Sequence, residues 1–425
     1  MMRRDVLMTY VTNNVNKTAG KRYKIIAVFL AVLCVYMLVC GSVFADYNKD
    51  EAQKYYRAAV IPEFTEERYA SADTESGQLI ISGNGTEKVI VGNLVKLMTL
   101  LLVFEKIDSG AIELGTTFAV TKHAQDVSVG KVRVYLDYGK KETIRVEQAI
   151  EAVCINGAQD AACALAEFIG GNEEQFVALM NAKAASMKLK NTLYTDSTGI
   201  NTDQYTCAED VALIMAELVG RHPTCLSYLN LTYGMFKHES TGQSDTEMVS
   251  SNPLNRRKFF EGSDGSMLGY SNEDKYSIAC TAAKDEKRVV SVILGEEDEN
   301  ARAGKVKKLA EYSLSNFTYS KLCSVGTFVK KVDIKEGKNK KIRTETAGDL
   351  YVLLNVNEVD KVKTSIVITD TLKAPVEEGV TCGYVAYFLD EQELGRVELR
   401  TAESMSRANW FVRLVRKILA FFGLE

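Results

Sequence analysis

The order of strand-like and helix-like segments constrains the fold of this chain more than any single residue does. Alternating runs at Tyr69–Asp73 and Gln78–Ser82 flank a turn sequence and predict a hairpin. Two further strand-like runs, Tyr276–Ala283 and Arg288–Leu294, come much later in the chain, after a helical block. Strands at both ends with helices between them predict one sheet that is closed late in the sequence and covered by a helical lobe.

A long apolar segment and helix-capping sequences predict the helices of this block. Leu94–Ile107 is almost wholly apolar, and Lys96 is the only charge in its first three turns, so we expect a buried helix there. Capping-box sequences at Asn172 and Thr206 predict the starts of two more helices. The remaining expected helices are Arg145–Ile155, Gln159–Ile169 and Asn300 to about Leu314.

A second, smaller domain is expected at residues 318–403, where helical periodicity stops and short alternating runs predict an all-β unit. The tail, residues 407–424, predicts an amphipathic helix that lies on a membrane surface. A helix docked on the β domain is the alternative. The apolar stripe comprises Phe411, Leu414, Val415, Ile418 and Phe422, and the basic side comprises Arg413, Arg416 and Lys417.

The N-terminal region predicts export. Residues 25–45 carry no charge, and residues 1–24 before them are rich in lysine and arginine, which favours a cytoplasmic location for residues 1–24. The uncharged stretch is long enough to span a bilayer, and Val43-Phe44-Ala45 also suits signal cleavage, so a transmembrane anchor and a cleaved signal peptide both remain open. In either case the rest of the chain is expected on the extracytoplasmic face of the cell membrane.

Charge and composition exclude several classes of function. A net charge of −4 gives no bulk attraction for nucleic acid, and no segment interleaves aromatic with basic residues. Seven of the nine cysteines lie outside the apolar stretch at residues 25–45 and are scattered without paired spacing, so no disulfide pairing follows. The histidines His123, His222 and His238 are far from any Cys-x-x-Cys pair. We therefore expect no metal site and no cofactor.

Three short sites carry the candidate chemistry. Asn93-Leu94-Val95-Lys96 opens the apolar helix, and Gly157-Ala158-Gln159 precedes Asp160-Ala161-Ala162 at a helix start. The third is Asp264-Gly265-Ser266-Met267-Leu268-Gly269-Tyr270. With these sites and the segments between them, residues 64–317 resemble the penicillin-binding serine D-alanyl-D-alanine carboxypeptidases, which rely on Ser-x-x-Lys, Ser-x-Asn and Lys-Thr-Gly motifs.

The resemblance implies an α+β fold of the DD-peptidase/β-lactamase type, with an antiparallel sheet and a helical lobe, followed by the β domain and the amphipathic helix. It also implies a role for each site residue. Asn93 stands at the nucleophile position and Lys96 at the general-base position. Gly157 and Gln159 replace the Ser and Asn of the second motif. Met267 and Leu268 replace the Lys and Thr that would bind the substrate, and Gly269 is kept.

We therefore interpret the chain as a cell-wall-related pseudoenzyme, because an amide side chain is not a usable nucleophile. Its expected partners are peptidoglycan stem peptides or cell-wall proteins. We expect the N-terminal segment and the C-terminal helix to attach the chain to the membrane. The alternative is an active serine carboxypeptidase with a displaced nucleophile such as Ser128, Ser266 or Ser271. A third interpretation is an envelope scaffold that binds no small ligand.

Overall fold

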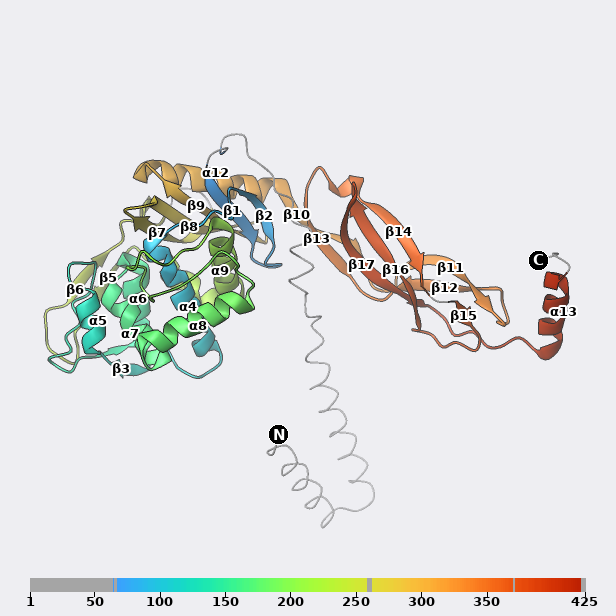
Figure 1. The fold of residues 1–425 in the computed structure, drawn as a ribbon, viewed down its shortest axis with the longest axis horizontal. Helices are drawn as coiled ribbons and strands as arrows, with labels where there is room; N and C mark the ends of the chain where they lie inside the picture. Colours follow the sequence, from blue (N-terminus) through green and yellow to red (C-terminus); the bar gives the residue numbers. More distant parts are fainter. Residues whose placement is uncertain (1–63, 65–66, 258–261, 370, 422–425) are drawn as a thin grey trace, which may run out of the picture. The chain divides into compact units, whose positions relative to one another are not determined.

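A computed structural model describes residues 64, 67–257, 262–369 and 371–421. Its first sheet has five antiparallel strands in the order β2-β1-β9-β8-β7 (Figure 1). The early hairpin therefore pairs with the last strand of the domain, β9, as the sequence predicts. The strands are β1 (Arg68–Asp73), β2 (Leu79–Gly83), β7 (Ser263–Ser271), β8 (Lys275–Lys284) and β9 (Lys287–Glu296).

Alternation along the strands gives the sheet two buried faces. Ala279 and Val292 face the helical lobe, whereas Ile278 and Ile293, one residue away on the same strands, pack against the opposite helix α12 (Glu299–Asn316). Figure 1 shows α12 on one side of the sheet and the other helices on the opposite side. A sheet enclosed by helices on both faces confirms the expected α+β architecture.

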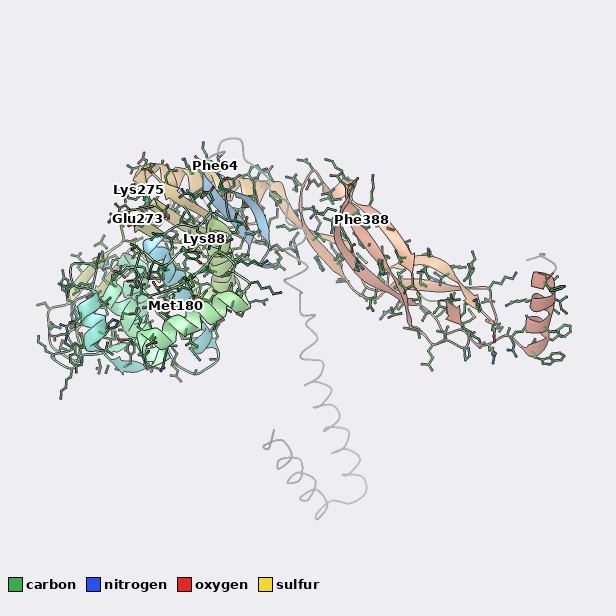
Figure 2. The ribbon with its side chains drawn as sticks, viewed as in Figure 1. Phe64, Lys88, Met180, Glu273, Lys275 and Phe388 are labelled. Carbon is green, nitrogen blue, oxygen red and sulfur yellow. The ribbon has the colours of Figure 1, made fainter. Side chains whose placement is uncertain are left out.

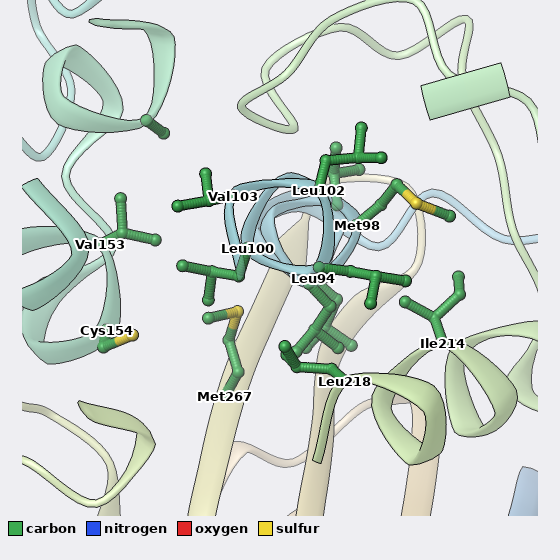
Figure 3. Close-up of a cluster of buried hydrophobic side chains, with 14 of the residues drawn as sticks. Leu94, Met98, Leu100, Leu102, Val103, Val153, Cys154, Ile214, Leu218 and Met267 are labelled. Carbon is green, nitrogen blue, oxygen red and sulfur yellow. The ribbon is translucent and has the colours of Figure 1, made fainter. Parts of the chain in front are cut away.

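The helical lobe is built around α4 (Lys96–Asp108), in which every residue from Lys96 to Phe104 is buried. Figure 3 shows side chains of α4 directed toward α6, α9 and β7, which explains why this helix is apolar on all sides. The other helices are α5 (Lys122–Val127), α6 (Val146–Asn156), α7 (Gln159–Gly170), α8 (Glu173–Ser186), α9 (Ala208–Arg221), α10 (Leu226–Leu229) and α11 (Pro253–Arg257). Two short ribbons pair β3 (Thr117–Ala119) with β4 (Thr143–Arg145), and β5 (Tyr233–Phe236) with β6 (Thr246–Val249).

The C-terminal part is an all-β unit with its own core of buried side chains, including Ile342, Cys382 and Leu399. It contains a six-stranded sheet in the order β14-β16-β17-β12-β11-β15 and the two-stranded pair β10-β13. The strands are β10 (Phe317–Cys323), β11 (Phe328–Lys335), β12 (Lys341–Thr346), β13 (Leu350–Asn355), β14 (Lys363–Ile368), β15 (Leu372–Lys373), β16 (Thr381–Leu389) and β17 (Gln392–Thr401).

The terminal helix α13 (Trp410–Phe421) contacts the β unit through its basic side. Arg413 pairs with Glu336 at 3.1 Å, and Arg416 donates to the carbonyl oxygen of Gly337 at 2.8 Å. Its apolar side is exposed: Phe411, Leu414 and Ile418 keep about half of their surface accessible. The helix therefore docks on the β unit by its basic face, as in the alternative interpretation, and the expected membrane contact of its exposed apolar face stays a prediction.

The start of α9 differs from the sequence expectation. The capping box at Thr206 is wrong, because α9 begins after Cys207 and the Thr206 hydroxyl instead pairs with that of Thr192 at 2.8 Å. The proposed anchor at residues 25–45 lies outside the described residues. Within the part of the chain that the structure describes, no helix is both long and apolar enough to cross a bilayer.

Candidate functional site

Asn93, Lys96 and Gln159 meet at the junction of the sheet and the helical lobe. Asn93 lies in a 3-10 turn, Gly92–Val95, that leads directly into α4, and Lys96 is the first residue of that helix. The Oδ1 atom of Asn93 accepts hydrogen bonds from Nζ of Lys96 at 2.7 Å and from Nε2 of Gln159 at 3.1 Å. Two of the three motif sites are therefore joined through one amide oxygen.

Lys96 is fully buried, and its amine also donates to the carbonyl oxygen of Thr198 at 2.6 Å. Burial lowers the pKa of Lys96 from 10.5 to about 7, and the neighbouring Asp196 carboxylate offsets part of that effect. Near neutral pH a large share of this amine is therefore uncharged. The site keeps a group with the basicity of a general base.

Asn93, the residue that shares a hydrogen bond with that base, offers it no usable nucleophile. The amide nitrogen of Asn93 is delocalised into its carbonyl group, and the amide oxygen already accepts two hydrogen bonds. Acyl transfer by the mechanism that the resemblance implies needs a hydroxyl oxygen that can form an ester. Asn93 contacts Lys96 directly but supplies no such oxygen.

Gly157 ends helix α6 in the left-handed conformation, with φ of 72°. A Cβ atom at this position would lie 3.0 Å from Nδ2 of Asn93. The place that the serine of the second motif would occupy therefore borders the Asn93 amide. No hydroxyl at Gly157 is available to relay a proton.

Met267, Leu268 and Gly269 lie on β7, the edge strand of the sheet. The Met267 side chain is buried against the core that contains α4 (Figure 3), and Leu268 packs partly toward the α12 side. A Cβ atom on Gly269 would lie 2.3 Å from the carbonyl oxygen of Val91, so this glycine lets β7 approach the chain's own backbone next to Asn93. Neither Met267 nor Leu268 thus supplies a cation at this edge of the sheet.

Two cavities meet at Asn93. The smaller, of about 60 Å³, is lined by Lys96, Met267 and their neighbours, and Lys96 is the only residue of its lining that carries a charge. The larger, of about 570 Å³, includes Lys131, Gln159 and Glu273 in its lining. Glu273, labelled in Figure 2, lies in the turn between β7 and β8. Ligand pockets typically measure about 300–1,000 Å³, so only the larger cavity has room for a peptide segment.

The serines considered as displaced nucleophiles lie in structural hydrogen bonds. Ser128 ends α5 and donates to the Gln125 carbonyl oxygen at 2.9 Å. Ser266 is buried, donates to Asn255 at 2.6 Å and accepts from Asn252 at 2.8 Å. Ser271 accepts from the Asp274 amide at 2.8 Å. None of these recorded partners is a base.

Sequence reasoning missed several residues that shape the site. Asp196 accepts backbone N–H groups from Thr198, Gly199 and Asn201, and so holds the loop whose carbonyl group receives Lys96. The segment Thr198-Gly199-Ile200 contributes to the resemblance and could have indicated this loop. Two amide oxygens at the site, Oδ1 of Asn156 and Oε1 of Gln159, are buried without a hydrogen-bond partner among the described residues.

Residues 56–298 match the family described as D-alanyl-D-alanine carboxypeptidase, and residues 317–407 match the C-terminal domain of penicillin-binding protein 5. D-alanyl-D-alanine carboxypeptidase DacF of Bacillus subtilis is 29% identical over 346 residues, covering 81% of this chain and 87% of the relative. DacA of Escherichia coli is 22% identical over 393 residues, covering 90% of this chain and 94% of the relative.

Solved structures agree on the fold. Penicillin-binding protein 5 from Haemophilus influenzae has a TM-score of 0.68 at 23% identity, with coverage of 82% of this chain and 100% of that one. The carboxypeptidase DacD from Francisella tularensis also has a TM-score of 0.68, at 21% identity, with coverage of 86% and 100%. At these identities the structural similarity shows the fold alone.

Proposed function

The chain belongs to the D-alanyl-D-alanine carboxypeptidase family, and we propose that it is a catalytically inactive member that binds peptidoglycan peptides or envelope proteins on the extracytoplasmic side of the membrane. The observation that carries this proposal is the pair of hydrogen bonds from Lys96 and Gln159 to Oδ1 of Asn93. Lys96 and Gln159 both donate to the amide of Asn93, and this amide cannot attack a carbonyl carbon. Removal of the serine in a comparable catalytic unit costs on the order of 10^6-fold in rate.

The proposed binding surface is the larger cavity beside Asn93. It offers Lys131 for an acidic group of a ligand and Gln159, whose unpartnered buried oxygen can accept an N–H. A stem peptide supplies both kinds of group, carboxylates and backbone amides. In the smaller cavity Met267 offers no charge to offset the desolvation of a terminal D-alanine carboxylate, and Lys96 is already engaged by Asn93 and Thr198, so we expect that carboxylate to gain little there.

Attachment to the membrane is proposed from helix α13 and the N-terminal stretch. Trp410, Phe411 and Phe421 are exposed on α13, and these apolar rings suit the boundary between headgroups and acyl chains. The uncharged residues 25–45 would add a second attachment or an export signal.

Binding of soluble muropeptides to the purified chain tests the ligand part of the proposal. We expect tripeptide and pentapeptide stems to bind with similar affinity, since the terminal D-alanines have no site. Lys131→Gln should weaken binding about tenfold, whereas Lys106→Gln on the exposed end of α4 should leave it unchanged. Absence of binding to either stem would favour an envelope scaffold. Release of D-alanine from the pentapeptide would contradict inactivity.

A further inference from the structure

A group of metal-ligand side chains lies outside the three motif sites, where α5 packs on α7. His123 comes from α5, and Cys163 and Glu167 lie one turn apart on the same side of α7. Their ligand atoms all lie within 4.8 Å of one another. Among the described residues this is the one set of three or more His, Cys, Asp or Glu side chains with that proximity.

The two separations that involve His123 match the edges of a tetrahedral zinc site. Sγ of Cys163 lies 3.5 Å from Nδ1 of His123, and Nδ1 lies 3.3 Å from Oε1 of Glu167. Zinc bonds of about 2.3 Å to sulfur and about 2.0–2.1 Å to nitrogen or oxygen give tetrahedral edges of about 3.5 Å for S···N and about 3.3 Å for N···O. The side chains therefore need little rearrangement to share one ion.

Neighbouring groups orient the ligands in the way that metal sites require. Nε2 of His123, the nitrogen not facing the cysteine, lies 3.5 Å from Oε2 of Glu173. A carboxylate there favours the proton on Nε2 and leaves Nδ1 free to bind a metal. The Thr121 hydroxyl donates to Oε2 of Glu167, which leaves Oε1 directed at the histidine.

The electrostatics of the group favour a cation. Cys163 is completely buried, and burial together with the carboxylates of Glu173, Glu167 and Asp196 raises the pKa of its thiol. The His123 side chain is half exposed, so an ion has a path from solvent and a fourth position open to water.

We propose that His123, Cys163 and Glu167 bind a zinc ion, with Glu173 as the positioning residue for the histidine. The ion would tie α5 to α7 and to the first turn of α8, where Glu173 lies. Glu173 also accepts from the Ser197 amide and hydroxyl at 3.0 Å and 2.6 Å. Ser197 precedes Thr198, whose carbonyl group holds Lys96, so the ion would brace the loop behind the degenerate site.

Cobalt and zinc titrations of the purified, reduced full chain test the proposal. One equivalent of Co²⁺ should give thiolate-to-cobalt charge-transfer absorption, and zinc should abolish it stoichiometrically, whereas excess Mg²⁺ should not. The His123 side chain is half exposed, so His123→Ala should abolish the cobalt charge-transfer absorption without unfolding the chain. Cys163→Ser should remove the charge-transfer band. Glu173→Gln should weaken zinc affinity about tenfold.

Matched controls come from groups of the same types elsewhere. His222→Asn removes a histidine paired with Asp108 at 2.5 Å, and Cys225→Ala removes another buried cysteine. Both variants should bind cobalt like the native chain. The proposal is overturned if the native chain shows no thiolate–cobalt band, or if His123→Ala and Cys163→Ser retain it. Binding that is lost in the control variants instead would place the ion at another site and overturn it as well.

Discussion

The position that a Cβ atom on Gly157 would occupy lies 3.0 Å from Nδ2 of Asn93, closer than side chains normally approach. Asn93 and Gly157, which the resemblance places at the nucleophile and second-motif serine positions, are therefore spatial neighbours. With Asn93 in place, the absence of a side chain at residue 157 relieves a contact. An asparagine at residue 93 and a glycine at residue 157 are thus sterically compatible with each other.

Gly157→Ser should destabilise the chain more than Gly130→Ser does. The two glycines have nearly equal φ values, 72° and 75°, but a Cβ on Gly130 would meet nothing within 4 Å. Both variants should lose about 1 kcal/mol or more from the left-handed backbone, and Gly157→Ser about 1 kcal/mol beyond that from the contact with Asn93. Urea unfolding measures the difference. It should shrink when Asn93→Ser is added, and an unchanged difference would refute the steric link.

Lys96→Met should change how stability depends on pH. The pKa of Lys96 is about 7 in the folded chain and 10.5 in the unfolded one, so between these values the unfolded chain holds the extra proton. The cost of burying the charge is therefore complete below pH 7 and is relieved as pH rises toward 10.5. Relative to Lys96→Met, the native chain should gain up to about 1.4 kcal/mol of stability per pH unit in this window.

The exposed variant Lys106→Met is the control for that measurement, since Lys106 lies at the solvent-facing end of α4. Unfolding curves at pH 7, 8 and 9 for the three proteins suffice. Parallel curves for the native chain and Lys96→Met would show that Lys96 is charged in the folded state at neutral pH.

Replacing Phe411 and Leu414 together by alanine should weaken binding to lipid vesicles. Both side chains are exposed on α13, and each buried methylene is worth about 0.8 kcal/mol, so the partition coefficient should fall at least tenfold. Flotation with vesicles that contain anionic lipid measures it. Val325→Ala, an exposed apolar position in the turn after β10, should bind like the native chain. Equal flotation of all three proteins would show that α13 does not attach the chain to vesicles.

Sequence periodicity and turn signals predicted four of the five strands of the first sheet and the main helices, because the alternation of apolar and polar residues is a local pattern; the edge strand β7 was identified only as a motif through the resemblance. The prediction that Thr206 caps α9 was wrong, because the Thr206 hydroxyl pairs with the Thr192 hydroxyl, and local sequence spacing does not indicate that contact. The motif residues were found through resemblance, but their mutual contacts were not. The acceptor role of Asn93 Oδ1 depends on Gln159, 66 positions away. His123 and Cys163 are separated by 40 positions, and helix packing alone brings them together.

Intact-mass analysis of the native chain after exposure to penicillin tests the central claim most directly. Asn93 cannot form an ester, so no mass increase is expected, even with prolonged incubation. A variant with Asn93→Ser, Gly157→Ser, Gln159→Asn, Met267→Lys and Leu268→Thr restores the three motifs and should acquire one drug-sized increment on residue 93. The same increment on the unaltered chain, mapped to any residue lining the cavities beside Lys96, would contradict the account.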